Sequence, residues 1–287
     1  MRFRKIYIEI SNICNLNCDF CHGTHRRPET MSAENFERTA RQAAPLAEQT
    51  HLHVTGEPLL HPEFRRIIEI CAACSLPVEI TTNGTLIRSA NAESLFDPVV
   101  RQVNISMHSI AENDSARLGD IFDFTREAFA RHPALYINYR LWNLGTSQES
   151  LESGKNEWLH RKIEEEFGII IPAAGHSAGR KSRKLLNRLY LHLDTCFEWP
   201  EISPARTPRT KGKCHALKSQ AAILVDGTVV PCCLDKEGVM ALGNCLAEPL
   251  ESIIGGTRAN EMIKGFDKGL LTEELCRNCS YSSRFSA

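Results

Sequence analysis

The chain has 287 residues, of which 42% are hydrophobic and 24% charged, and its formal net charge is −1. This balance is typical of a folded globular chain and argues against a nucleic acid or an anionic membrane as partner. No apolar run reaches transmembrane length, and the N-terminus is too charged for a signal peptide, so we expect a cytoplasmic protein. Twelve cysteines in that reducing compartment predict metal or iron–sulfur chemistry rather than disulfides.

Strand and helix patterns alternate along the first 175 residues. Apolar or alternating runs predict strands at residues 5–11, 51–55, 77–84, 99–107, 134–143 and 169–175. Helical patterns cover residues 32–49, 61–75, 112–132 and 150–168. Such alternation indicates parallel strands joined by right-handed crossovers. Six units predict an α/β fold of the partial (β/α)6 barrel type, with its site at the carboxyl ends of the strands.

The pattern changes near residue 200. Residues 200–213 are rich in proline and basic side chains and predict a linker. Two apolar runs around Asp226 and Gly227 then predict a β-hairpin, and a short helix is expected near residues 248–264. We therefore expect a barrel domain at residues 1–199 and a small hairpin-and-helix domain at residues 200–287.

Three cysteines follow the first predicted strand with the spacing C-x3-C-x2-C, namely Cys14, Cys18 and Cys21. A [4Fe–4S] cluster held by three thiolates keeps one iron open for another ligand. The alternative is a zinc site completed by His22 or His25, because zinc accepts sets of three cysteines and one histidine. A buried core role does not suit cysteines with polar flanks.

A second set of four cysteines lies near the C-terminus. Its members are Cys214, Cys232, Cys276 and Cys279, spaced C-x17-C-x43-C-x2-C. Four thiolates suit a fully ligated [4Fe–4S] cluster, and a zinc ribbon is the alternative. This small C-terminal part is therefore interpreted as an iron–sulfur domain.

The remaining cysteines show no complete ligand spacing. Cys233 and Cys245 are spare, and either can replace a member of the four-cysteine set. Cys71 and Cys74 lie one helical turn apart and are predicted to be core residues, and Cys196 is predicted to be structural.

The three-cysteine loop and several later motifs resemble the radical S-adenosylmethionine (SAM) superfamily. Phe20 stands before the last cysteine, and "TGEP" at 55–58 is similar to a Gly-Gly-Glu-Pro motif, with Thr55 in place of the first glycine. "TTNG" at 81–84 and "NISMHS" at 104–109 resemble the ends of the family's third and fourth strands. The resemblance spans residues 5 to about 145.

This resemblance implies a SAM site and its ligands. The open iron chelates the SAM amino and carboxylate groups, the Glu57 segment holds the ammonium, and Ser106 with Arg117 holds the carboxylate. An electron from the reduced cluster then cleaves SAM to a 5′-deoxyadenosyl radical, which abstracts a substrate hydrogen. The implied cofactor-binding residues are Phe20, Gly56, Glu57, Asn83, Ser106 and Arg117.

The four-cysteine set resembles the shortened SPASM, or twitch, domain found in this superfamily. The arrangement is similar to that of a dehydrogenase of butirosin biosynthesis, which oxidises an aminocyclitol hydroxyl. The resemblance thus implies two [4Fe–4S] clusters and SAM as cofactors. The auxiliary cluster, with no open iron, would accept the electron released when a carbinol radical loses its proton.

The side chains expected to face the substrate lie on the fourth and fifth predicted strands. We assign catalytic roles to His108, where an aspartate is usual in the family, and to Arg140, for which a contact with the SAM carboxylate or a helix salt bridge is the alternative. Trp142 and Asn143 stand beside Arg140, and donors with an aromatic wall suit a polar, sugar-like substrate. Strand alternation sends Arg140 and Trp142 to one face and Tyr139 to the other.

These features predict a radical SAM oxidoreductase acting on a small polar molecule. The barrel begins near residue 5, which leaves no room for an N-terminal peptide-binding extension and favours a small substrate. A flavodoxin- or ferredoxin-like protein is the implied electron donor. The alternatives are a peptide maturase that crosslinks or epimerises residues, and a zinc-binding or electron-transfer protein without SAM turnover.

Overall fold

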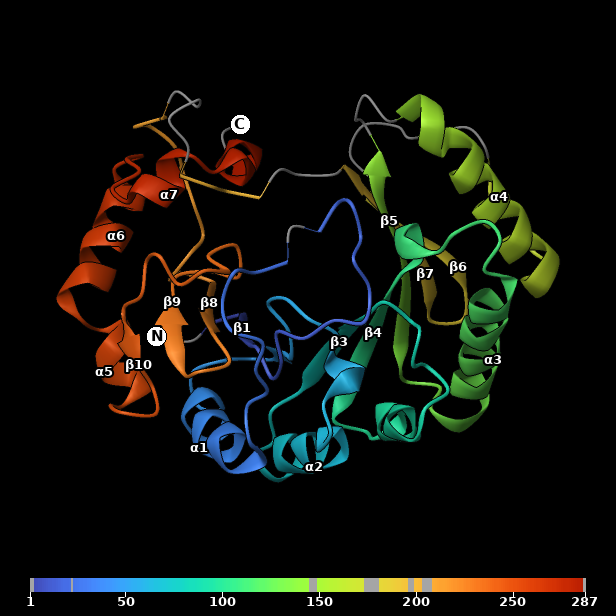
Figure 1. Cartoon of the computed structure of the whole chain (residues 1–287), viewed down its shortest axis with the longest axis horizontal. Helices are drawn as coiled ribbons and strands as arrows, with labels where there is room; N and C mark the ends of the chain where they lie inside the picture. The colour runs from blue at the N-terminus through green and yellow to red at the C-terminus, as the bar shows by residue number, and fades with distance from the viewer. Residues whose placement is uncertain are drawn as a thin grey trace. The chain divides into compact units, whose positions relative to one another are not determined.

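The structure is a computed structural model that describes residues 3–21, 23–144, 149–172, 181–195, 199–202 and 208–285. The chain forms two compact units (Figure 1). The first unit contains residues 1–78 together with residues 197–287, and the second contains residues 79–196. The C-terminal segment thus folds with the N-terminal third of the chain.

The first unit is built on β1 (Lys5–Ile8), which lies parallel to β2 (Thr50–His51) on one side and to β8 (Gln220–Ile223) on the other. The antiparallel strands β9 (Thr228–Val230) and β10 (Gly243–Asn244) continue beyond β8, giving the order β10-β9-β8-β1-β2. The C-terminal hairpin therefore pairs directly with the first predicted barrel strand.

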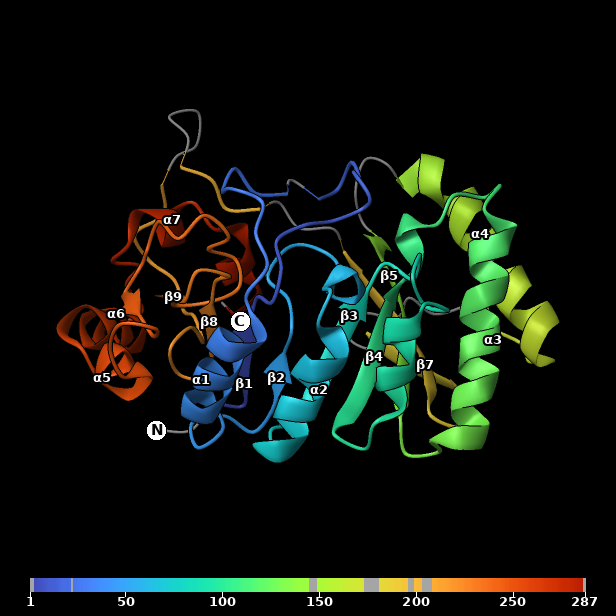
Figure 2. The same ribbon diagram turned by 60° about the horizontal axis from the view of Figure 1, so that its bottom comes forward.

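Seven helical segments of the described chain belong to the first unit. They are α1 (Ala33–Ala43), α2 (Phe64–Ala73), α5 (Leu250–Ile254), α6 (Thr257–Asp267), α7 (Glu274–Arg277) and the 3-10 turns η1 (Pro58–Leu60) and η4 (Ser280–Phe285). The Ser32 hydroxyl accepts a hydrogen bond from the Asn35 amide at 3.2 Å and caps α1. Helices α1 and α2 lie side by side (Figure 2) and bury Phe36 and Phe64. The helix predicted near 248–264 is broken into α5 and α6 at residues 255–256.

The predicted hairpin at Asp226 and Gly227 is confirmed. Gly227 has φ +87°, and the Leu224 amide donates to the Thr228 carbonyl at 2.8 Å. The Asp226 carboxylate also accepts from the Thr228 amide at 3.0 Å. This positive φ requires glycine, because a side chain there would strain the backbone.

The second unit is also an α/β layer. Its strand order is β3-β4-β5-β7-β6. The strands are β3 (Val78–Thr82), whose first residue belongs to the first unit, β4 (Val100–Ser106), β5 (Tyr136–Leu144), β6 (Ser182–Leu186) and β7 (Leu189–Thr195). Strands β4, β5 and β7 are parallel, and β6 is an antiparallel edge strand.

Helices α3 (Ser115–Arg131) and α4 (Glu149–Phe167) lie beside each other in the second unit (Figure 2). The shorter turns η2 (Ala90–Phe96) and η3 (Met107–Ser109) follow β3 and β4 in the chain. The Phe122 ring of α3 makes an edge contact with Phe167 at a centroid distance of 5.4 Å. The predicted α/β class is confirmed in both units.

The sixth predicted strand was placed wrongly. Residues 169–172 form no strand, residues 173–175 lie outside the described part, and the parallel neighbour of β5 is β7. Buried Leu189 and Leu191 alternate there with half-exposed Tyr190 and His192, the pattern of a strand covered on one face. The basic residues before this pattern concealed it.

The domain boundary at residues 199–200 stays a prediction. Residues 196–198 and 203–207, on either side of it, lie outside the described part. Among the described helices, none is long and apolar enough to cross a membrane.

We predict that Gly227→Ala lowers the free energy of unfolding by about 1–3 kcal/mol, because an L-residue is strained at positive φ. The added Cβ would also lie 2.6 Å from Leu246 Cγ. Gly119→Ala is the matched control, since Gly119 is an exposed position inside α3 where an added Cβ would have no heavy atom within 4 Å outside the backbone of its own helix. This control should raise the stability by about 0.5–1 kcal/mol. Urea unfolding measures both, and equal effects would contradict the turn assignment.

Candidate functional site

The three-cysteine loop follows the carboxyl end of β1 in the first unit. Cys14 and Cys21 are exposed and Cys18 is half-buried, while the Cys21 amide donates to the Cys18 carbonyl at 2.9 Å. Phe20 is 37% exposed on the same loop. Of the two histidines in the zinc alternative, His25 is exposed and His22 lies outside the described residues. The thiols can therefore be reached by iron and by a further ligand.

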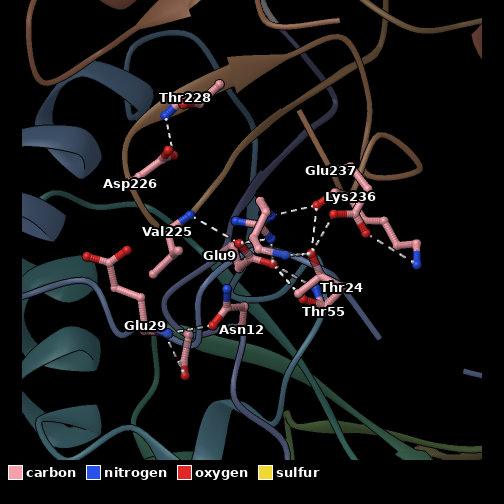
Figure 3. A network of polar contacts seen from close by, with 12 residues as sticks. Glu9, Asn12, Thr24, Glu29, Thr55, Val225, Asp226, Thr228, Lys236 and Glu237 are labelled. Atoms are coloured by element: carbon pink, nitrogen blue, oxygen red, sulfur yellow. Dashed lines mark hydrogen bonds and ion pairs between the residues drawn. The ribbon is translucent and has the colours of Figure 1, made fainter. Parts of the chain in front are cut away.

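The base of this loop is closed by Asn12. Its side-chain amide donates to the Arg27 carbonyl at 2.9 Å, and its oxygen accepts from the Glu29 amide at 2.7 Å (Figure 3). Next to these bonds, the Met31 amide donates to the Ile10 carbonyl at 2.8 Å, which joins the residues just before and just after the loop. The two ends of the loop are thus tied to each other.

The segment after β2 packs directly on the start of the loop. Gly56 has φ +77°, and a Cβ built there would lie 2.4 Å from the Ser11 carbonyl oxygen and 2.9 Å from that of Ile13. The Glu57 amide donates to the Ile13 carbonyl at 2.8 Å, and the buried Glu57 carboxylate accepts from the Leu59 amide at 3.1 Å. The structure therefore brings the predicted residues Gly56 and Glu57 to the three-cysteine loop.

A buried glutamate holds the surrounding segments together. Glu9 has no exposed surface, and Arg26 donates to both carboxylate oxygens at 2.8 and 2.7 Å. The Thr55 amide and hydroxyl bind one oxygen at 3.1 and 2.8 Å, and the Val225 amide binds the other at 3.1 Å (Figure 3). Sequence analysis did not identify Glu9. The available signal was a charged residue inside the apolar run of the first strand.

All four predicted auxiliary cysteines line one cavity of the first unit. They are Cys214, Cys232, Cys276 and Cys279. The rest of the wall is largely apolar and includes Leu271, Leu275 and Met240, whose sulfur lies 3.6 Å from the Cys276 sulfur. Burial raises the pKa of three of these thiols, Cys214, Cys232 and Cys276, and neighbouring thiols raise it further.

The donor set of this cavity fits an iron–sulfur cluster, because cluster irons are held by cysteine thiolates. In the described part of the chain, no three Cys, His, Asp or Glu side chains already stand in a metal-binding arrangement. Because burial raises the pKa of the cavity thiols, cluster binding there must include the release of their protons.

The spare cysteines do not line the cavity. Cys233 follows Cys232 but packs against Tyr7, whose side chain forms a hydrogen bond with it. The Cys245 sulfur lies 3.7 Å from the Thr39 hydroxyl and is buried behind α1. The geometry thus favours Cys232 as the ligand.

The other three cysteines lie elsewhere. Cys71 is fully buried in α2, as expected for a core residue, and Cys74 is half-buried at the end of that helix. Cys196 lies outside the described residues.

In the second unit, Arg117 joins the ends of β3 and β4. Its guanidinium donates to the Asn83 carbonyl and to the Ser109 hydroxyl, and also to the Ser109 carbonyl at 3.2 Å. The Ser109 hydroxyl in turn donates to the Ser106 carbonyl at 2.7 Å. Three predicted SAM-binding residues, Asn83, Ser106 and Arg117, are therefore brought together in this unit.

His108 and Arg140 also lie together. His108 Nδ1 forms a hydrogen bond of 3.0 Å with the Arg140 carbonyl, and burial lowers the pKa of His108 to about 4. The imidazole is therefore neutral at pH 7. The Arg140 guanidinium donates to the Thr81 hydroxyl at 3.2 Å and stacks 4.6 Å from the Trp142 ring centroid. Tyr139 is fully buried on the opposite face, as the alternation predicts.

A row of polar side chains continues on the Arg140 face and was not identified from sequence. The Gln102 amide donates to Glu79 at 3.3 Å and to Asn104 at 2.8 Å, and Asn138 donates to Asn104 at 3.0 Å. Asn104 is paired with Asn138 across β4 and β5, and it has no exposed surface. Polar residues at every second position of β4 and β5 were the signal that could have revealed this row.

Comparison with known proteins matches two segments of the chain to known domains. Residues 8–133 match the Radical SAM superfamily, and residues 214–280 match SPASM, an iron–sulfur cluster-binding domain. A probable GTP 3′,8-cyclase of Methanocella arvoryzae is 34% identical over 115 residues, which make up 38% of this chain and 36% of that protein. The chain thus spans about a third of the length of the curated relatives it matches.

Solved structures share the fold over nearly the whole chain. BtrN in complex with AdoMet and 2-DOIA has a TM-score of 0.62 and 17% identity, covering 98% of this chain and 94% of BtrN. SuiB of Streptococcus suis bound to S-adenosylmethionine has a TM-score of 0.61 and 15% identity, covering 100% of this chain and 75% of SuiB.

The two matched domains bring with them SAM and two [4Fe–4S] clusters as cofactors. The three-cysteine loop lies in the first matched segment, and the four cavity cysteines lie in the second. The chain therefore carries a radical SAM domain at residues 8–133 and a C-terminal SPASM domain at residues 214–280.

Proposed function

We propose that this enzyme is an oxidoreductase that removes two electrons from a small polar substrate at a carbinol carbon. When bound at the three-cysteine loop, the cluster supplies the electron that splits SAM into methionine and a 5′-deoxyadenosyl radical. The radical takes the carbinol hydrogen atom, a base takes the hydroxyl proton, and the remaining electron leaves through the auxiliary site. SAM and the alcohol thus become methionine, 5′-deoxyadenosine, the ketone and one proton.

The observation that carries the proposal is the cavity lined by four thiols. Four cysteine ligands saturate the irons of a [4Fe–4S] cluster, so such a cluster exchanges electrons and offers no open iron to a substrate. An electron acceptor is what the oxidation of a carbinol radical requires, whereas an epimerisation or a redox-neutral cyclisation does not require one. The electron balance in turn implies a flavodoxin- or ferredoxin-like protein as donor for the first turnover.

We propose that SAM is held by residues of the first matched segment, 8–133. Cys14, Cys18 and Cys21 bind the cluster, and the Gly56–Glu57 segment supplies the acceptors that an ammonium group needs. Ser106 and Arg117 hold the carboxylate, because a guanidinium forms paired, permanently charged hydrogen bonds. Phe20 and Asn83 complete the proposed SAM site.

Arg140 is the proposed substrate contact, and the neutral His108 is its positioning residue through the Arg140 carbonyl. The row of amides and carboxylate on the same face is polar, which favours a substrate that carries several hydroxyl or amino groups. BtrN, which shares the fold, was solved with AdoMet and 2-DOIA.

The decisive test is an anaerobic incubation with SAM, a chemical reductant and polyols or aminocyclitols deuterated at their carbinol carbons. We expect deuterium in 5′-deoxyadenosine and one ketone for each SAM consumed. Deuterium transfer from a peptide and not from any polyol would favour the peptide maturase instead. Absence of 5′-deoxyadenosine under every condition would contradict the radical SAM mechanism.

We predict that the enzyme reconstituted without oxygen holds about eight irons per chain, the sum of two four-iron clusters. Cys276→Ala should lower the count to about four, since one cavity ligand is lost. Cys245→Ala is the matched control, because this buried thiol lies outside the cavity, and it should leave the count unchanged. Iron and sulfide assays check the result, and a loss of iron in both variants would contradict the ligand assignment.

We predict that Arg117→Lys weakens SAM binding roughly 10- to 100-fold, the effect of losing charge-assisted hydrogen bonds to a carboxylate. Arg126→Lys is the control, because Arg126 is exposed on the same helix and pairs with Asp123 and Glu166. Equilibrium SAM binding to the reconstituted proteins measures the effect, and urea unfolding verifies that Arg117→Lys is folded. Equal SAM affinities for the two folded variants would contradict the assignment of Arg117 to the SAM site.

A further inference from the structure

We propose that residues 232–240, here called the strap, couple the filling of the four-cysteine cavity to the position of the three-cysteine loop. Lys236 and Glu237 are its positioning residues. The inference rests on the proposed function, because it requires that both thiol sets bind clusters. It adds a physical connection between the two sites inside the first unit.

Both ends of the strap lie at the four-cysteine cavity. Cys232, its first residue, lines the cavity and is buried. Met240, its last residue, also lines the cavity, and its sulfur lies 3.6 Å from the Cys276 sulfur. A group that fills the cavity therefore fixes both ends of the strap.

The strap is internally stiff. The Asp235 carboxylate is fully buried and accepts from the Val239 amide at 2.9 Å and from the Met240 amide at 2.7 Å. The Asp235 amide donates to the Cys232 carbonyl at 3.2 Å. Because these turns are closed by hydrogen bonds, a shift of Cys232 is passed on to the middle of the strap.

The middle of the strap binds the segment that follows Cys21. Lys236 Nζ donates to the Gly23 carbonyl at 2.6 Å, and its own carbonyl accepts from Arg26 Nε at 2.7 Å. The Glu237 carboxylate accepts from the Thr24 hydroxyl at 3.0 Å (Figure 3). It also accepts from the His25 amide at 3.2 Å. Each residue from 23 to 26 is thus hydrogen-bonded to Lys236 or Glu237.

Three of these contacts combine a charged group with partial burial: Lys236 to the Gly23 carbonyl, Arg26 to the Lys236 carbonyl, and Thr24 to Glu237. The Lys236 side chain is only 5% exposed, and the Glu237 side chain is 27% exposed. Charge-assisted hydrogen bonds in such surroundings are roughly twice as strong as neutral ones. Gly23 stands two positions after Cys21, so the strap sets where the last thiol of the loop can lie.

Coupling between two binding sites is reciprocal. A cluster in the cavity should hold residues 23–26 in place, and a loop closed on its own cluster should stabilise the filled cavity by the same factor. Couplings of this kind change an equilibrium by roughly 5- to 150-fold, and we expect a value on the order of tenfold here.

The test uses the full chain with Cys14, Cys18 and Cys21 changed to Ala, so that only the cavity can take a cluster. Amide hydrogen exchange of residues 23–30 is compared before and after anaerobic reconstitution with iron and sulfide. We expect exchange at residues 23–26 to slow on the order of tenfold when the cavity is filled. Amides of α1 serve as the internal reference and should not change.

The same comparison is made with Lys236→Met and Glu237→Gln, in which filling should no longer slow this exchange. Lys236→Arg should retain part of the effect, and Lys264→Met, at an exposed position of α6, should retain all of it. The proposed coupling would be contradicted if exchange at residues 23–26 did not change when the cavity is filled. It would also be contradicted if filling slowed this exchange equally in the Lys236 and Glu237 variants. A cavity that takes no iron would contradict the proposed function and the strap together.

A second measurement tests the reverse direction in the fully reconstituted enzyme with all seven ligands present. The rate at which a chelator removes iron from the cavity should fall on the order of tenfold when SAM is added. Glu237→Gln should lose this protection. Equal protection by SAM in the two proteins would contradict the coupling.

Discussion

The buried carboxylate of Glu9 is the interaction on which the arrangement of the first unit depends. A charge without exposed surface costs several kcal/mol unless it is paired and hydrogen-bonded. Glu9 meets this condition with two bonds from Arg26, two from Thr55 and one from Val225. The three partners belong to the three-cysteine loop, to the segment after β2 and to the C-terminal hairpin. The Glu9 carboxylate, five residues before Cys14, thus fixes the three-cysteine loop, the segment after β2 and the C-terminal hairpin relative to one another.

Most of the fold followed from local patterns in the sequence, and its errors have local causes. The Ser32 cap and the turn at Gly227 were predictable because a side-chain acceptor and a positive φ act within a few residues. Strand β7 was not predicted, because basic residues precede its apolar pattern. A strand was predicted at residues 169–175 instead. The parallel pairing of β1 with β8 joins positions more than 200 residues apart, and no periodicity in a single chain specifies such a partner.

The metal ligands were easier to identify than the groups that support them. Cysteine spacing carries ligand chemistry directly, and the structure gathers the four predicted auxiliary cysteines in one cavity. The amide of Asn104 and the carboxylate of Glu9 offered no comparable spacing, since a polar residue in a strand most often faces water. Their roles come from partners on other strands, which become visible only when the register between strands is known.

The two thiol sets differ in exposure in the way that their proposed chemistry requires. Cys14 and Cys21 are exposed, which an iron that must meet both SAM and an electron donor needs. Around the cavity, Cys232 is buried, the other three cysteines are half-buried and the wall is largely apolar, and burial raises the pKa of the Cys232 thiol. Burial and hydrogen bonds to the sulfur atoms set the reduction potential of such clusters. A shielded, fully ligated cluster therefore suits the acceptance of single electrons, whereas the exposed loop suits ligand exchange.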